Sequence, residues 1–210
     1  MKPIIEALKN RYAVKLFDDS KKLTVEQIED LKAVVNLTAS SLGMQPYRVV
    51  IIENQKIKEA LKPHAYDQAQ ITTASHLFLF CAHQQIDNAY VDDYMNLISE
   101  IRHQSRESLK GYESMVSSFV NSRTKEELEV WASKQAYIGI GNLLTSAAIA
   151  GIDACPMEGF DPQAFKEVLN LDKMNLQPLA LVALGYKSPE DKYAKLAKVR
   201  RSNDTMFMQF

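Results

Sequence analysis

Residues 131–160 read WASKQAYIGIGNLLTSAAIAGIDACPMEGF, and this stretch decides the fold. No charged residue occurs from Gln135 to Ile152, and apolar side chains cover every side of a 3.6-residue helical wheel. A helix that is apolar all round is a buried helix, so we expect other structure to cover it on all sides. Gly139 and Gly141 allow another backbone to approach closely. We therefore expect a large surface to pack on this helix, and a second copy of the chain is one candidate.

The uncharged run is long enough to raise the question of a membrane span, for which about 18 apolar residues are the lower limit. Gln135, Asn142, Thr145 and Ser146 interrupt the run with polar groups. Its glycines and alanines are small and only weakly apolar, so the run as a whole is less apolar than a membrane span. We therefore predict a buried helix and no membrane partner.

The composition describes a chain without a strong overall charge. Lysine and arginine together number 25, against 26 aspartate and glutamate residues, so no global field recruits nucleic acid or an acidic membrane. The 210 residues suffice for one substantial core, and we predict a single domain over residues 1–210. Met1–Glu6 carries charge before a signal-peptide core could form, which favours a cytoplasmic location. Cys81 and Cys155 border apolar runs, where buried thiols are expected, although the sequence leaves a disulfide open.

Local patterns predict several helices. Residues 24–27 and 124–127 both match the capping box, in which a threonine hydroxyl and a side chain three residues later bond each other's backbone N–H groups. The second box opens the long helix. Further helices are expected over residues 4–10 and 54–61, in one or two pieces over 87–121, and after Asp161-Pro162. The buried face expected for the helix after the first box is Val25, Ile28, Leu31, Val34 and Val35.

Buried strands are expected over Tyr47–Glu53, Leu77–Ala82 and Pro178–Tyr186. The continuous apolar run of Leu77–Ala82 is typical of a strand that is covered on both faces. About four such strands with these helices indicate a layered domain of helices and strands.

Several familiar kinds of catalytic site are excluded because the chain lacks their sequence motifs. The four histidines form no HExxH and the two cysteines form no CxxC, so we predict no metal site. The chain has no Gly-x-Ser-x-Gly, which argues against a serine hydrolase. Gly139-Ile140-Gly141 resembles the start of a dinucleotide fingerprint, but it lacks the third glycine and lies inside a helix.

A dispersed set of segments remains as candidate chemistry. Arg11 and Lys15 lie near the start, Ser40-Ser41 follows the second helix, Pro156–Gly159 follows the long helix, and Lys198-x-Arg200 lies near the end. Cations such as these can clamp a phosphate. Each segment alone is more simply explained as solvated surface charge, a helix-end turn or a strand-to-helix connection, so only their joint pattern indicates a function.

In this order, the segments resemble the FMN-dependent nitroreductase family, in particular its oxygen-insensitive nitroreductase and dihydropteridine reductase branch. The likeness extends from Ala7-Leu8-Lys9 to Arg200. It implies an α+β fold with a central, mostly antiparallel sheet flanked by helices, and a domain-swapped-type homodimer with FMN sites at the interface. It also implies an NAD(P)H oxidoreductase that reduces nitroaromatics, quinones or similar planar acceptors by a ping-pong two-electron (hydride) scheme, with NADH or NADPH as co-substrate.

The resemblance assigns the phosphate and the flavin ring to different segments. Arg11, Lys198 and Arg200 would hold the FMN phosphate, and Lys15 would lie beside the ribityl chain and the pyrimidine edge. Pro156, Met157, Glu158 and Gly159 would lie against the isoalloxazine ring. The backbone N–H near Glu158 would face flavin N5, and no side chain would serve as a catalytic group.

The partner subunit would complete the site. Ser40 and Ser41, with the loop through Gly43 to Gln45, would reach the flavin from the second chain. Phe119 or Tyr112 would line the substrate pocket.

The chain departs from its enteric relatives at several of these positions. Tyr12 and Ala13 replace His and Ser, and Gly43 replaces Asn. At the pyrimidine edge, Asp67 and Gln70 fall where Asn and Lys are expected. A neutral Gln70 stabilises the negative charge of a reduced flavin less than lysine would, so we predict a lower flavin potential.

Two other functions remain open from the sequence. The same fold could serve a narrower reaction, such as enone reduction, reductive dehalogenation or flavin fragmentation. The chain could also be an FMN-binding protein that has lost catalysis.

Overall fold

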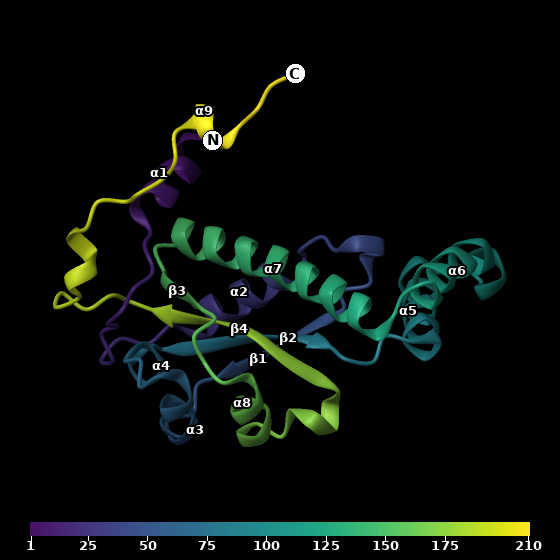
Figure 1. Ribbon diagram of the computed structural model, residues 1–210, viewed down its shortest axis with the longest axis horizontal. Helices are drawn as coiled ribbons and strands as arrows, with labels where there is room; N and C mark the ends of the chain where they lie inside the picture. Colours follow the sequence, from purple (N-terminus) through teal and green to yellow (C-terminus); the bar gives the residue numbers. More distant parts are fainter.

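The computed structural model describes residues 1–210 and places a four-stranded sheet between two layers of helices (Figure 1). The strands lie in the order β1-β2-β4-β3, and each neighbouring pair is antiparallel. The predicted antiparallel sheet is therefore confirmed. The strands are β1 (Tyr47–Ile52), β2 (His76–His83), β3 (Asp153–Met157) and β4 (Leu176–Gly185).

Alternating residues of β2 define the two layers of the core. Leu77, Leu79 and Cys81 pack with residues of α3 (Gln55–Leu61), α4 (Gln70–Thr73) and α8 (Pro162–Val168). Phe78 and Phe80 pack on the opposite face with α2 (Val25–Asn36) and α7 (Lys125–Ile149). Covering on both faces, as the continuous apolar run predicts, is confirmed for this strand.

Both predicted capping boxes are present, at the N-termini of α2 and α7. The predicted buried face of α2 is only partly right, because Val25 is 81% exposed while Ile28, Leu31 and Val35 are buried. The first turn of α2 therefore extends past the surface on which the later turns pack.

The long helix α7 is buried along one side only. Its buried side chains include Gln135, Ala136, Ile140 and Leu143, and Gly139 lies so close to the sheet that a Cβ there would be 3.0 Å from the Tyr47 hydroxyl. Tyr137, Ile138 and Ile149 are exposed, and a Cβ on Gly141 would meet nothing within 4 Å. One chain therefore covers only one side of the helix, and its other, apolar side is left for the large surface that the sequence leads us to expect there.

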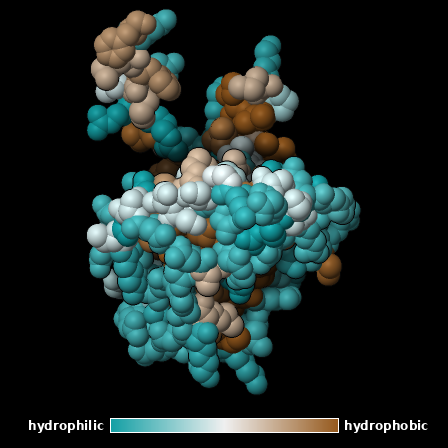
Figure 2. Space-filling model, turned by 90° about the vertical axis from the view of Figure 1, so that its right-hand side faces the viewer, coloured by the Kyte–Doolittle hydropathy of each residue, from teal (hydrophilic) through white to brown (hydrophobic).

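The remaining helices lie around the ends of this sandwich. α5 (Asn88–Arg102) and α6 (Arg106–Asn121) form a hairpin beyond one end of the sheet (Figure 1). α1 (Lys2–Asn10) and α9 (Asn203–Met206) lie with the two termini above α7, and apolar residues gather on the segments that project there (Figure 2). None of the helices combines the length and hydropathy that a membrane crossing requires.

Candidate functional site

Three cations from the two ends of the chain, Arg11, Lys198 and Arg200, lie together as a cation cluster, and Lys15 lies near Arg11 at Cys155 of β3. Lys198 donates to the Arg11 carbonyl at 2.5 Å and also to the Leu8 carbonyl, which joins the C-terminal segment to the end of α1. None of Arg11, Lys15, Lys198 and Arg200 has a carboxylate within 4.0 Å. The structure thus brings together cations whose charge no acidic side chain offsets.

Arg11 is the most constrained member of this cation cluster. Burial and the nearby Arg200 both lower the pKa of its guanidinium, and its Nε is a buried donor without an acceptor. Burial, followed by the charges of Arg11 and Arg200, also lowers the pKa of Lys198. An unpaired buried donor and mutually repelling cations are both relieved by a bound anion.

Lys15 and Gln70 meet at a cysteine on β3. The Cys155 sulfur accepts from Lys15 Nζ at 3.9 Å and from Gln70 Nε2 at 3.8 Å. Burial raises the pKa of the Cys155 thiol, although the nearby Lys15 and Gln70 oppose the shift. Gln70 is only 3% exposed and makes no other side-chain hydrogen bond, so its amide oxygen is free to accept.

A buried aspartate fixes the backbone that carries Lys15. Asp191 accepts from the Lys15 backbone N–H at 2.9 Å and from the Tyr12 hydroxyl at 3.0 Å. Burial alone would raise the pKa of Asp191, but hydrogen bonds, led by that of the Lys15 N–H, hold it below its ordinary value. Tyr12 thus points at Asp191, while Ala13 forms a bridge to Ala154 of β3.

The turn after β3 exposes its backbone. Pro156 is exposed, and its missing N–H is tolerated because β3 is an edge strand. The Met157 side chain instead packs in the core with Phe160. Glu158 and Gly159 are exposed and follow directly, while Asp67 is exposed on the nearby connection between α3 and α4.

The loop that contains Ser40 and Ser41 is shaped by three tyrosines of the α5–α6 hairpin. The Tyr94 and Tyr112 hydroxyls each donate to the Leu42 carbonyl at 2.8 Å, and Tyr90 donates to the Met44 carbonyl at 3.0 Å. Leu42 and Gly43 both have positive φ angles, 57° and 69°. Because the Tyr112 hydroxyl is engaged in this way, Tyr112 supports the loop in this structure.

The loop and the β3 turn attach to different sides of α7. The Ser41 N–H donates to Gln135 at 2.8 Å, whereas Tyr137 donates to Glu158 at 2.5 Å. Two residues along a helix are separated by a rotation of about 200° and a rise of about 3 Å. The helix itself therefore stands between the predicted serine loop and the predicted flavin-facing turn of the same chain.

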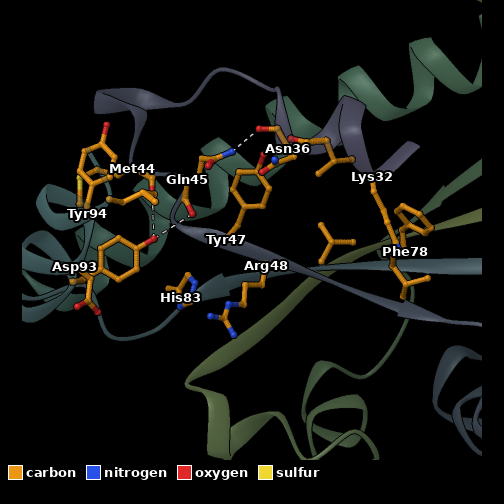
Figure 3. Close-up of a pocket in the computed structure, with 15 residues that line it drawn as sticks. Lys32, Asn36, Met44, Gln45, Tyr47, Arg48, Phe78, His83, Asp93 and Tyr94 are labelled. Atoms are coloured by element: carbon orange, nitrogen blue, oxygen red, sulfur yellow. Dashed lines mark hydrogen bonds between the residues drawn. The ribbon is translucent and has the colours of Figure 1, made fainter. Parts of the chain in front are cut away.

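Two cavities border the loop of residues 40–45. A cavity of about 710 Å³ opens over β1, α2 and α5, and its wall includes Gln45, whose amide donates to the Asn36 carbonyl (Figure 3). A second, of about 530 Å³, is lined by Ser41, Phe119, Trp131 and Lys134 among others. The cation cluster lines neither cavity, so a single chain holds the predicted site in two separate parts.

Comparison with known proteins identifies the family. The nitroreductase family profile matches residues 8–186. A protein of Staphylococcus haemolyticus, provisionally named an NAD(P)H nitroreductase, is 36% identical over 201 residues and covers 90% of both chains. The chain belongs to the nitroreductase family.

Solved structures agree with this nitroreductase fold. A provisionally named nitroreductase of Bacillus subtilis superimposes with a TM-score of 0.88 at 22% identity, covering 100% of this chain and 99% of the other. A nitroreductase of Exiguobacterium sibiricum, solved in complex with FMN, has a TM-score of 0.84 at 19% identity and covers 99% and 97%. The sequence-based prediction of an α+β nitroreductase-like fold, in an oxidoreductase family, is confirmed.

Two polar residues of this family member are not marked by any motif. Gln135 holds the Ser41 N–H, and Asp191 holds the Lys15 segment across 176 residues of chain. A buried glutamine within an apolar helix is a signal that could have pointed to the first. Asp191 lies in a polar tail without periodicity, and nothing in the sequence distinguishes it.

Proposed function

We propose that this chain is an FMN-dependent NAD(P)H oxidoreductase that reduces nitroaromatics, quinones or similar planar acceptors in two-electron steps. The observation that carries the proposal is the cation cluster of Arg11, Lys198 and Arg200, which has no carboxylate partner and includes the buried, unpaired Arg11 Nε. The names of the relatives and the FMN complex of the Exiguobacterium protein support it.

The residues present fit the parts of FMN. The cluster offers charge-assisted hydrogen bonds to a phosphate. Lys15 and Gln70 offer a cation and an amide at one edge of β3, which suits the polar pyrimidine edge of a flavin. Pro156, Glu158 and Gly159 are exposed, so this segment is accessible to the flavin ring.

Bound FMN would supply a two-electron centre that accepts hydride from NAD(P)H and passes it to the acceptor. The chain's own contribution is to bind and orient. Lys15 provides positive charge where a reduced flavin becomes negative, and Asp191 holds the Lys15 backbone in place. Gln70 adds a neutral hydrogen-bonding group there in place of a second cation.

A homodimer with two shared sites completes the proposal. In one chain, α7 separates the Ser41 loop from Glu158, and the apolar side of α7 with Ile138 and Gly141 is uncovered. A second copy packed on this side would cover it and bring Ser40, Ser41 and Phe119 to the first chain's cation cluster.

The test begins with the visible spectrum of the purified protein reconstituted with FMN. Anaerobic addition of NADH or NADPH is expected to bleach the flavin absorbance, and re-oxidation by a quinone or nitroaromatic should follow. Arg11→Gln should weaken FMN binding about 10- to 100-fold, the loss expected for a charge-assisted contact. Lys9→Gln is the matched control, because Lys9 is exposed and pairs only with Glu6.

Each outcome bears on the proposal. Wild-type protein that takes up no FMN would refute it. Bound flavin that NAD(P)H never bleaches would favour a non-catalytic FMN-binding protein.

A further inference from the structure

The turn from Met157 to Asp161 leaves two consecutive backbone donors free. The Phe160 N–H donates to the Glu158 carbonyl at 3.0 Å, and the Asp161 N–H donates to the His64 carbonyl at 2.8 Å. The N–H groups of Glu158 and Gly159 donate to no acceptor in the chain. Adjacent unpaired N–H groups on an exposed turn form a donor pair for an electron-rich ligand atom.

Tyr137 anchors this turn from the uncovered side of α7. Its hydroxyl donates to Glu158 Oε1 at 2.5 Å. Burial and the bond to Glu158 raise the pKa of Tyr137 to about 12, so the hydroxyl remains a donor throughout the neutral range. The carboxylate of Glu158 is thereby held against the helix.

Gln68 anchors the same turn from the opposite direction. Its Nε2 donates to the Gly159 carbonyl at 2.8 Å and to the Ala65 carbonyl at 3.0 Å. Gln68 Nε2 also lies 3.4 Å from the place where a Cβ on residue 159 would stand, and the Tyr66 ring lies 3.8 Å from it. A helix side chain thus holds the Glu158 side chain, and a loop side chain holds the Gly159–Phe160 peptide, so the turn is fixed at two points.

We infer that Tyr137 and Gln68 are positioning residues that hold the Glu158 and Gly159 N–H groups toward the bound flavin and turn the Glu158 carboxylate away from it. The inference rests on the proposed function. It adds two residues whose side chains act through the turn and need not touch the cofactor. Hydrogen bonds that favour the more electron-rich state of a flavin raise its potential, whereas a freed carboxylate nearby lowers it.

The expected effect of Tyr137→Phe follows from the one bond removed. A hydrogen bond to a charged group contributes about 1.5 kcal/mol or more, which is roughly tenfold in an equilibrium or a rate. We expect anaerobic flavin reduction by NAD(P)H to slow by about tenfold. The midpoint potential should fall by roughly 30 mV, the equivalent of tenfold for a two-electron couple. Gln68→Ala should shift both quantities in the same direction.

Two further variants make the test specific. Within a Glu158→Gln background, adding Tyr137→Phe should lower the potential by less than it does in the wild-type background, because no carboxylate is then freed near the flavin. Tyr193→Phe is the control for loss of a tyrosine hydroxyl, because that side chain is exposed and its hydroxyl bonds nothing. The melting temperature of each variant shows whether the fold is retained.

The outcomes separate this inference from the proposed function. Wild-type protein that binds no FMN would contradict the proposed function itself. Wild-type protein that binds and reduces FMN, with Tyr137→Phe reduced at the same rate and potential, would refute the positioning role alone. A lower melting temperature with unchanged potential would refute it as well.

Discussion

Replacement of Gly43 by alanine should destabilise the protein for two separable reasons. Gly43 has φ of +69°, where a residue with a Cβ costs about 1–2 kcal/mol. That Cβ would also stand 2.5 Å from the Tyr94 hydroxyl oxygen, so the ring would have to move and give up its bond to the Leu42 carbonyl. Loss of that bond adds about 1 kcal/mol, for a total of about 2–3 kcal/mol.

The second contribution should vanish when the hydroxyl is absent. In a Tyr94→Phe background the nearest side-chain atom to the new Cβ is 3.6 Å away, which is an ordinary contact. Tyr112 still donates to the Leu42 carbonyl, so that oxygen keeps a partner. Gly43→Ala should therefore cost only about 1–2 kcal/mol there, giving a coupling of about 1 kcal/mol.

Urea unfolding of the four proteins of this cycle, without FMN, measures these differences. Gly111→Ala is the control, because Gly111 lies inside α6 and a Cβ there meets nothing within 4 Å. It should raise the free energy of unfolding by about 0.5–1 kcal/mol. Equal costs of Gly43→Ala in both backgrounds would refute the steric argument.

Three further predictions concern charge, pH and assembly. Gln70→Lys should raise the flavin midpoint potential by roughly 20 mV, because about 1 kcal/mol from an added cation favours the reduced state; spectroelectrochemistry showing no rise would contradict this. Burial lowers the pKa of Lys58 to about 8. From about pH 8 to 10 the unfolded chain therefore binds more protons than the folded one, and the free energy of unfolding should rise with pH over that window. Urea titrations should show this rise flattened in Lys58→Met, which should also be less stable by about 1–3 kcal/mol because the Ala74 carbonyl loses its donor. Ile138→Arg should convert the proposed dimer to monomers in sedimentation and weaken FMN binding at least tenfold, and a dimer of unchanged affinity would count against the shared site.

Local chemistry explains which elements could be predicted from the sequence. The capping boxes at Thr24 and Thr124 depend on groups three residues apart, and both are present. Within β2, residues Leu77–Ala82 are all apolar because both faces of the strand are covered. The prediction for Val25 is wrong because periodicity defines the direction of a buried stripe, but not how far the opposing surface extends.

The candidate site was less predictable because its members meet through long-range contacts. Resemblance grouped Arg11 with Lys198 and Arg200, and the structure brings these cations together. It gave no indication of Asp191, which organises the Lys15 backbone from the far end of the chain. The site assignments remain predictions that FMN binding by the variants can test.

The absence of charge along α7 from Gln135 onward is explained by packing on both of its sides, and one chain supplies that packing on one side only. One side of the helix, with Gly139 and Gln135, packs on the sheet and holds the Ser41 loop. The other side, with Tyr137 and Ile138, holds the Glu158 turn and is otherwise uncovered. A charge on either side would be buried without a partner if two copies pack there, at a cost of several kcal/mol. In the proposed dimer, an uncharged α7 can be buried on both sides, and each chain can therefore contribute residues to both sites.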